Sequence, residues 1–137
     1  MNIKQAIENQ LKATLGLTAL VGPNIYWREF PQGFSGKGIC INKISAPRET
    51  AMVADPGIVY ARFQFTAMGT TEKEPDDVLT QVAGVLQNFV GIMGTLGAST
   101  GVQVDYTEYV NENEIPSDPN ITGMFLNGAD WYIYYHE

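Results

Sequence analysis

Apolar and polar side chains alternate without interruption through residues 59–68. The apolar set is Val59, Ala61, Phe63, Phe65 and Ala67, and the set between them is Tyr60, Arg62, Gln64, Thr66 and Met68. A period of two is typical of a β-strand with one buried face. Such a strand needs sheet neighbours and a layer of apolar side chains to pack on it. We therefore expect residues 59–68 to form the centre of a sheet.

Two segments have the helical period instead. Asn2 is placed to cap a first helix that ends near Gly16. Residues 17–21 are predicted to add about one more helical turn, which the Gly-Pro-Asn sequence at 22–24 ends. A second helix is predicted from about residue 71 to 90, with Thr71 and Glu74 at capping-box spacing and Pro75 in its first turn. Its apolar stripe consists of Val78, Val82, Val85, Leu86 and Phe89.

Four further strands are predicted, at residues 25–27, 39–45, 102–110 and 124–136. Ile44 is out of phase in the second of these, which indicates either a bulge or a strand covered on both faces. Gly128 indicates a kink or bulge in the last strand. In the 102–110 strand, simple alternation puts Tyr106 on the side of Val104. Residues 46–57, 91–101 and 111–122 are rich in Gly, Pro and polar residues and are predicted to be loops. The first and last of these are long enough to be contact segments.

The predicted order of elements is therefore α-β-β-β-α-β-β. It defines an α+β fold, a two-layer sandwich in which a mainly antiparallel sheet of about five strands carries two helices on one face. At 137 residues and 45% hydrophobic content, the chain is expected to form a single domain over residues 1–137. The chain shows neither an apolar run long enough for a membrane span nor a signal-peptide pattern, so we expect a protein made and soluble in the cytoplasm.

Charge is distributed unevenly along the chain. Residues 1–62 hold seven basic groups against four acids, a net charge of +3, while residues 63–137 hold Lys73 against eleven acids, a net charge of −10. A protein that reads nucleic-acid sequence needs a basic surface, so this class is disfavoured. An acidic surface can face a basic partner, can let DNA slide past without sticking, or can simply maintain solubility.

The residue types that catalysis requires are scarce. Cys40 lies in an apolar run and is expected to be a buried small hydrophobe. His136 is the only histidine and the penultimate residue, a poor position for a catalytic base that would act with Cys40 or a serine and with Asp130. The acids near residues 72–77 lack the spacing of a calcium loop and fit the start of a helix. We therefore predict no enzyme, no catalytic residue, no metal site and no cofactor.

The polar face of the predicted sheet has an unusual composition. It is expected to present Tyr60, Arg62, Gln64, Tyr132 and Tyr134. Tyrosine and arginine are enriched at protein interfaces because they combine apolar area with polar groups. These five residues are our interface candidates. The alternative is that long loops fold over this face.

Several of these segments together resemble a known family. They are Leu-Thr-Ala-Leu-Val-Gly at 17–22, Asn-Ile-Tyr-Trp-Arg-Glu-Phe-Pro-Gln-Gly at 24–33, the strand at 39–45, Ala-Arg-Phe-Gln-Phe-Thr-Ala at 61–67 and Asp-Trp-Tyr-Ile-Tyr-Tyr-His-Glu at 130–137. With the order of elements, they resemble the tail-completion, or tail-terminator, proteins of long-tailed bacteriophages over residues 3–137. The shared motifs are patterns of apolar type, and the chain departs from the family in its acidic second half and in the long segment 111–122.

The resemblance implies a structural role without catalysis. Such a protein forms a homo-oligomeric ring, usually of six copies, that caps the tail tube, stops its elongation and offers a surface to the head-proximal connector or stopper protein. It resides in the virion, at the head-proximal end of the tail, and in the host cytoplasm during assembly. DNA passes through the ring without sequence-specific binding, and no membrane is involved. The alternatives are another head-tail neck or adaptor protein and a small oligomeric α+β protein that binds a ligand.

Overall fold

The structure is a computed structural model that describes residues 2–46, 58–94, 101–115 and 124–136. Within these residues the helices are α1 (Ile3–Lys12), α2 (Leu15–Val21) and α3 (Lys73–Leu86). The strands are β1 (Ile25–Trp27), β2 (Gly38–Ser45), β3 (Ile58–Gly69), β4 (Gly91–Met93), β5 (Val102–Ile115) and β6 (Phe125–His136). No described helix is both long and apolar enough to cross a membrane.

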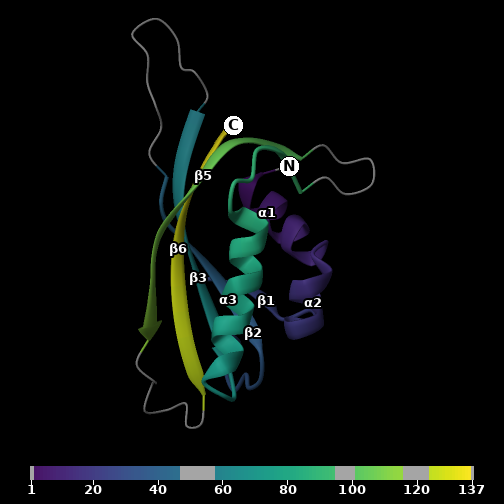
Figure 1. Cartoon of the computed structure of the whole chain (residues 1–137), viewed down its shortest axis with the longest axis vertical. Helices are drawn as coiled ribbons and strands as arrows, with labels where there is room; N and C mark the ends of the chain where they lie inside the picture. Colours follow the sequence, from purple (N-terminus) through teal and green to yellow (C-terminus); the bar gives the residue numbers. More distant parts are fainter. Residues whose placement is uncertain (1, 47–57, 95–100, 116–123, 137) are drawn as a thin grey trace, which may run out of the picture.

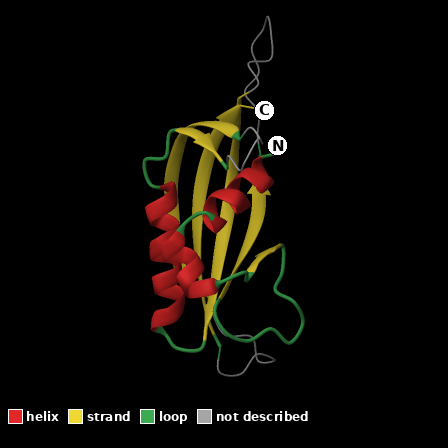
Figure 2. Ribbon diagram, turned by 90° about the vertical axis from the view of Figure 1, so that its right-hand side faces the viewer, coloured by secondary structure: helices red, strands yellow, loops and turns green. Residues whose placement is uncertain are grey.

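The strands form one curled, mixed sheet in the order β1-β2-β3-β6-β5-β4. β1 and β2 are parallel, and every other pair of neighbours is antiparallel. The three helices lie together against one face of the sheet (Figures 1 and 2). The predicted α+β class is confirmed, whereas the prediction of about five strands and two helices is wrong. β4 occupies part of the glycine-rich segment that we expected to be a loop, and α2 is a helix of its own.

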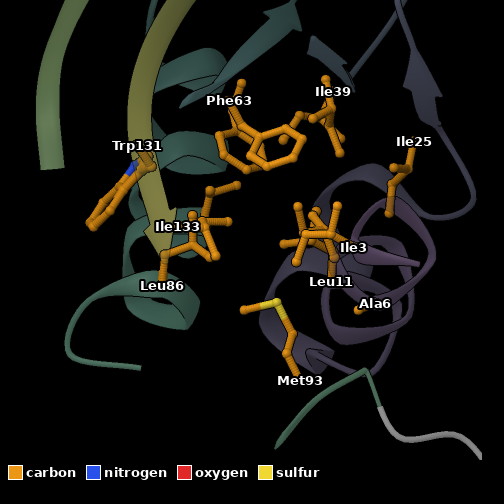
Figure 3. Packing of buried hydrophobic residues seen from close by; sticks show 14 of the residues in the cluster. Ile3, Ala6, Leu11, Ile25, Ile39, Phe63, Leu86, Met93, Trp131 and Ile133 are labelled. Atoms are coloured by element: carbon orange, nitrogen blue, oxygen red, sulfur yellow. The ribbon is translucent and has the colours of Figure 1, made fainter. Parts of the chain in front are cut away.

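β3 has the central position predicted for it. It pairs with β6 along its whole length, from Ile58 opposite His136 to Gly69 opposite Phe125, and with β2 on its other side. Its alternate side chains are fully buried, and Phe63 belongs to the same core cluster as residues of α1 and α3. Figure 3 shows Phe63 and Ile133 of the sheet facing Leu11 of α1 and Leu86 of α3.

The first helix begins as predicted but ends earlier. The Gln5 backbone N–H donates to Asn2 Oδ1 (2.9 Å) and the Asn2 backbone N–H donates to Gln5 Oε1 (3.2 Å), which completes a capping box. α1 then stops at Ala13, and the extended Thr14 begins α2. Gly16 lies inside α2 rather than at a C-terminal cap. A Cβ there would come within 2.3 Å of the Gln81 side chain, so glycine lets α2 approach α3 closely.

α3 has Pro75 in its first turn, as predicted, but the Thr71–Glu74 capping box is wrong. Glu72 occupies the cap position without a side-chain hydrogen bond. Glu74 Oε2 instead accepts hydrogen bonds from the backbone N–H (2.6 Å) and the hydroxyl (3.0 Å) of Thr70. These bonds, chiefly the one from the backbone N–H, hold the pKa of Glu74 below its ordinary value.

β5 differs most from its prediction. It extends through residues 111–115, which we expected to belong to a loop, and the rest of that segment lies outside the described residues, as does the segment 47–57. Its register against β6 shifts between Val104 and Tyr106 and again between Tyr109 and Asn111. The first shift turns Tyr106 to the face opposite Val104, so the prediction from simple alternation was wrong.

Two bulges were predicted elsewhere, at Gly128 and at Ile44. Gly128 pairs with Thr66 of β3 in regular register, and the register shifts between β5 and β6 lie in β5 instead. The bulge predicted at Ile44 is confirmed, between Lys43 and Ser45.

Gly94 provides a test of how α1 is attached to the sheet. Its φ is +79°, and a Cβ would lie 2.4 Å from the Ala6 Cα of α1. Its backbone N–H also donates to Gln10 Oε1 (3.1 Å). We expect Gly94→Ala to lower the free energy of unfolding by about 2 kcal/mol, because the backbone of α1 must move away. Urea denaturation measures this change.

The matched control is Gly84→Ala in α3. A Cβ at Gly84 meets nothing within 4 Å. Alanine is the better helix former, so this variant is expected to gain up to about 1 kcal/mol. Equal stability of the two variants would contradict the close packing of β4 on α1.

Glu74 gives a prediction for acid conditions. Because its folded pKa lies below the unfolded value of 4.5, the unfolded chain binds more protons in that range, and stability falls as the pH drops below about 4.5. The urea midpoint of Glu74→Gln is therefore expected to fall less steeply with acid than that of the unchanged protein. Glu72→Gln is the control, since Glu72 makes no cap hydrogen bond. Parallel acid profiles for the unchanged protein and Glu74→Gln would contradict the Thr70 contact.

Candidate interaction surface

All five interface candidates lie on the sheet face opposite the helices, which we call the open face. The open face is defined by Tyr60, Arg62 and Gln64 of β3 and by Tyr132 and Tyr134 of β6. Each is partly exposed, while its neighbours in the sequence, such as Ala61 and Ile133, are buried beneath the helices. Tyr60 lies opposite Tyr134, and Arg62 lies opposite Tyr132. The structure therefore brings four of the five predicted residues together as two cross-strand pairs, and Gln64 lies opposite Asp130.

The tyrosines form a continuous aromatic group across three strands. The rings of Tyr60 and Tyr134 stack with centroids 5.7 Å apart, and Tyr106 of β5 lies 5.4 Å from Tyr134 on its other side. Tyr132 lies 6.4 Å from Tyr134. Burial among these rings, together with the nearby Glu108 carboxylate, raises the pKa of Tyr134, so it remains a neutral hydrogen-bonding group. Sequence reasoning missed Tyr106, because its place depends on a bulge that alternation does not reveal.

Arg62 and Asp130 form an ion pair beside the tyrosines. Asp130 Oδ2 accepts hydrogen bonds from Arg62 Nε (3.0 Å) and Nη2 (2.5 Å). These bonds raise the pKa of the Arg62 guanidinium above its ordinary value. The second carboxylate oxygen of Asp130, Oδ1, is buried and has no hydrogen-bond partner among the described residues. The pair places a nearly buried carboxylate and a half-exposed guanidinium at the centre of the open face.

The segment between β1 and β2 covers one end of the open face, so the alternative that loops fold over this face is partly correct. This segment borders an open hollow of about 860 Å³, which is lined by apolar residues such as Phe30, Phe34 and Met68 and by polar residues such as Arg28 and Asn42. Phe30 and Phe34 stack at 5.4 Å, and a Cβ at Gly38 would collide with Phe34. The open-face tyrosines do not line this hollow.

The structure separates the groups considered for nucleophilic chemistry. Cys40 pairs with Thr66 of β3, and Thr66 pairs with Gly128 of β6. His136 is eight residues beyond Gly128 along β6, which separates it from the level of Cys40 by about 26 Å in the strand direction. His136 Nε2 contacts Asp105 Oδ2 at 2.6 Å. Burial raises the pKa of the Cys40 thiol to about 11. Among the described residues, no group of three His, Cys, Asp or Glu side chains could hold a metal ion.

Comparison with known proteins yields a structural likeness only. No protein-family model matches the sequence, and no curated protein matches it. A solved chain from the virion of a native gene transfer agent (GTA) particle superposes with a TM-score of 0.75 at 14% sequence identity. The match covers 98% of this chain and 95% of that chain. At this identity the likeness shows a shared fold over nearly the whole length of both chains.

The Arg62–Asp130 pair can be tested by removing its members singly and together. Arg62→Met is expected to lower the free energy of unfolding, because it leaves the buried Asp130 carboxylate without its charged partner. The double variant Arg62→Met/Asp130→Leu should recover most of this loss, since no unpaired charge remains. Urea denaturation of the four members of the cycle gives the coupling energy. Additive losses would show that the pair is not coupled.

Proposed function

We propose that this chain is a structural protein of a virion. The observation that carries the proposal is the shared fold with a chain of a gene transfer agent virion, over 98% of this chain. The resemblance of residues 3–137 to tail-terminator proteins is independent support, because it rests on sequence patterns.

Within the virion, the proposed role is a tail terminator. Copies of the chain form a ring, usually of six in the family it resembles, which caps the tail tube, stops its elongation and provides the interface to the head-proximal connector. The protein acts by binding alone. Its open face supports this role, since stacked tyrosines around an ion pair form a surface suited to protein contact. The acids of the second half of the chain are compatible with DNA passing through the ring without binding.

The competing role in the same particle is that of a neck protein that joins head to tail without ending tube growth. Electron microscopy of particles produced without this gene separates the two. A terminator predicts abnormally long, headless tubes beside tailless heads. Tubes of normal length that fail to join heads would instead indicate a neck protein. Intact particles would overturn the virion proposal and favour a protein that binds a ligand, for which the open hollow beside Phe30 and Phe34 offers space.

The open face is tested by the double substitution Tyr132→Glu/Tyr134→Glu. Two carboxylates there would remove apolar contact area and would have to be desolvated on binding. We expect at least a tenfold loss of incorporation into particles, measured by quantitative immunoblotting of purified tails, a magnitude that corresponds to about 1.4 kcal/mol.

The matched control is Thr80→Glu/Gln87→Glu, which adds the same charge at two exposed positions near or in α3. This variant should be incorporated normally. Circular dichroism and urea denaturation of both variants verify that they remain folded. Normal incorporation of a folded Tyr132→Glu/Tyr134→Glu variant would exclude the open face as a contact surface.

A further inference from the structure

The outer edge of β5 is a long strand edge without a described partner. β4 pairs only with Val102–Val104, so residues 105–115 pair with β6 on one side alone. No backbone hydrogen bond to another described segment covers the outer side of this stretch. In Figure 1 the second half of β5 lies at the border of the molecule, away from the helices. An uncovered strand edge presents a row of N–H and C=O groups that can pair with another chain.

The opposite side of the sheet has a shorter edge of the same kind. β1 pairs only with Ile39–Ile41 of β2, and the Arg28 backbone N–H reaches no further than the Ile41 carbonyl. Residues 42–45 of β2 are therefore paired with β3 on one side alone among the described strands. Lys43, Ile44 and Ser45 are exposed there.

The two edges carry opposite charge. β5 holds Asp105, Glu108, Glu112 and Glu114 and no basic residue. Residues 25–45, which form β1, β2 and the segment between them, hold Arg28, Lys37 and Lys43 against Glu29, a net charge of +2. Because β1 and β2 lie at one edge of the sheet and β5 lies near the other, one edge region is basic and the other is acidic.

We propose that copies of this chain associate edge to edge, with the outer edge of β5 in one copy pairing with residues 42–45 of β2 in the next. This inference rests on the proposed ring and names the contact that builds it. β2 and β5 run in opposite directions within the sheet, because three antiparallel pairings separate them. Copies that stand side by side in the same orientation therefore pair β5 and β2 as antiparallel strands and continue the sheet from one copy to the next.

The side chains are placed to support this pairing. Lys43 lies opposite Phe63, and Glu112 lies opposite Ala129, so both are on the helix-bearing side of the sheet. In a continued antiparallel sheet, Lys43 meets Glu114, two residues beyond Glu112 on the same side, in the register that leaves residues 39–41 to β1, and such a cross-strand pair of opposite charge is favourable. Pairing of β5 with β5 would instead bring acidic strands together. The contact is thus between two different surfaces, and such contacts close into rings or extend into filaments rather than ending at dimers.

Cysteine cross-linking tests this contact directly. The variants are Lys43→Cys, Glu112→Cys and Glu114→Cys, the last two covering adjacent registers on the same side of β5. Cross-linking with a short thiol reagent is carried out at about pH 8, where the raised pKa of the native Cys40 keeps it unreactive. It is applied both to concentrated purified protein and to assembled particles.

We expect a mixture of Lys43→Cys with Glu112→Cys or Glu114→Cys to give cross-linked dimers, in at least tenfold higher yield than any one variant alone. The chain that carries Lys43→Cys and Glu114→Cys together should give a ladder of multimers. The control is a mixture of Lys12→Cys with Thr80→Cys, two exposed helix positions, which should not cross-link.

Two results would overturn the inference. One is efficient cross-linking of Glu112→Cys alone, which would mean that like edges meet. The other is the absence of edge cross-links in particles that contain the protein, in which case the virion role stands and the edge contact fails. If the protein is absent from particles, the proposed function fails, and cross-linking of the concentrated protein still decides whether the two edges meet.

Discussion

The pairing of β3 with β2 and β6 is the interaction on which the rest of the structure depends. Every apolar side chain on the helix-bearing side of β3 is buried, and within the described part of the chain the sheet is the layer against which the three helices pack. Because the strand is paired on both sides along most of its length, its polar backbone is satisfied while its side chains separate cleanly into a core face and an open face. The core and the candidate surface are therefore two sides of one strand.

The sequence correctly predicts the elements in which apolar residues recur at a regular interval. Alternation correctly places the faces of β3 and β6, and with them the five residues of the open face. It fails in β5, where the bulges at Asp105 and Val110 depend on the register with β6 rather than on the local sequence. β4 was missed because three residues beside glycines carry no periodic signal, and its place is fixed by contacts of Met93 and Gly94 with α1.

The side chains of the open face are held in place by their neighbours and are still partly exposed to a partner. Arg62 is oriented by Asp130, and Tyr134 is held between Tyr60 and Tyr106, so these side chains lose little further freedom when a partner binds. The buried oxygen of Asp130 that lacks a described partner leaves a hydrogen-bond acceptor at the centre of this group. Cys40 and His136, which we considered for nucleophilic chemistry, lie at distant positions on the sheet.

The two bulges of β5 have a consequence for how its length can change in evolution. Each inserts one residue and reverses which side the following residues face, so that the two together restore the original phase. Loss of Asp105 or of Val110 would therefore remove one bulge and leave the pairs on either side of it unchanged, with Tyr106 still opposite Tyr134 and Thr107 still opposite Ile133. Relatives that share this sheet should therefore differ in length within β5 by single residues at these two bulges, because a one-residue change elsewhere in the strand would exchange the faces of the residues beyond it.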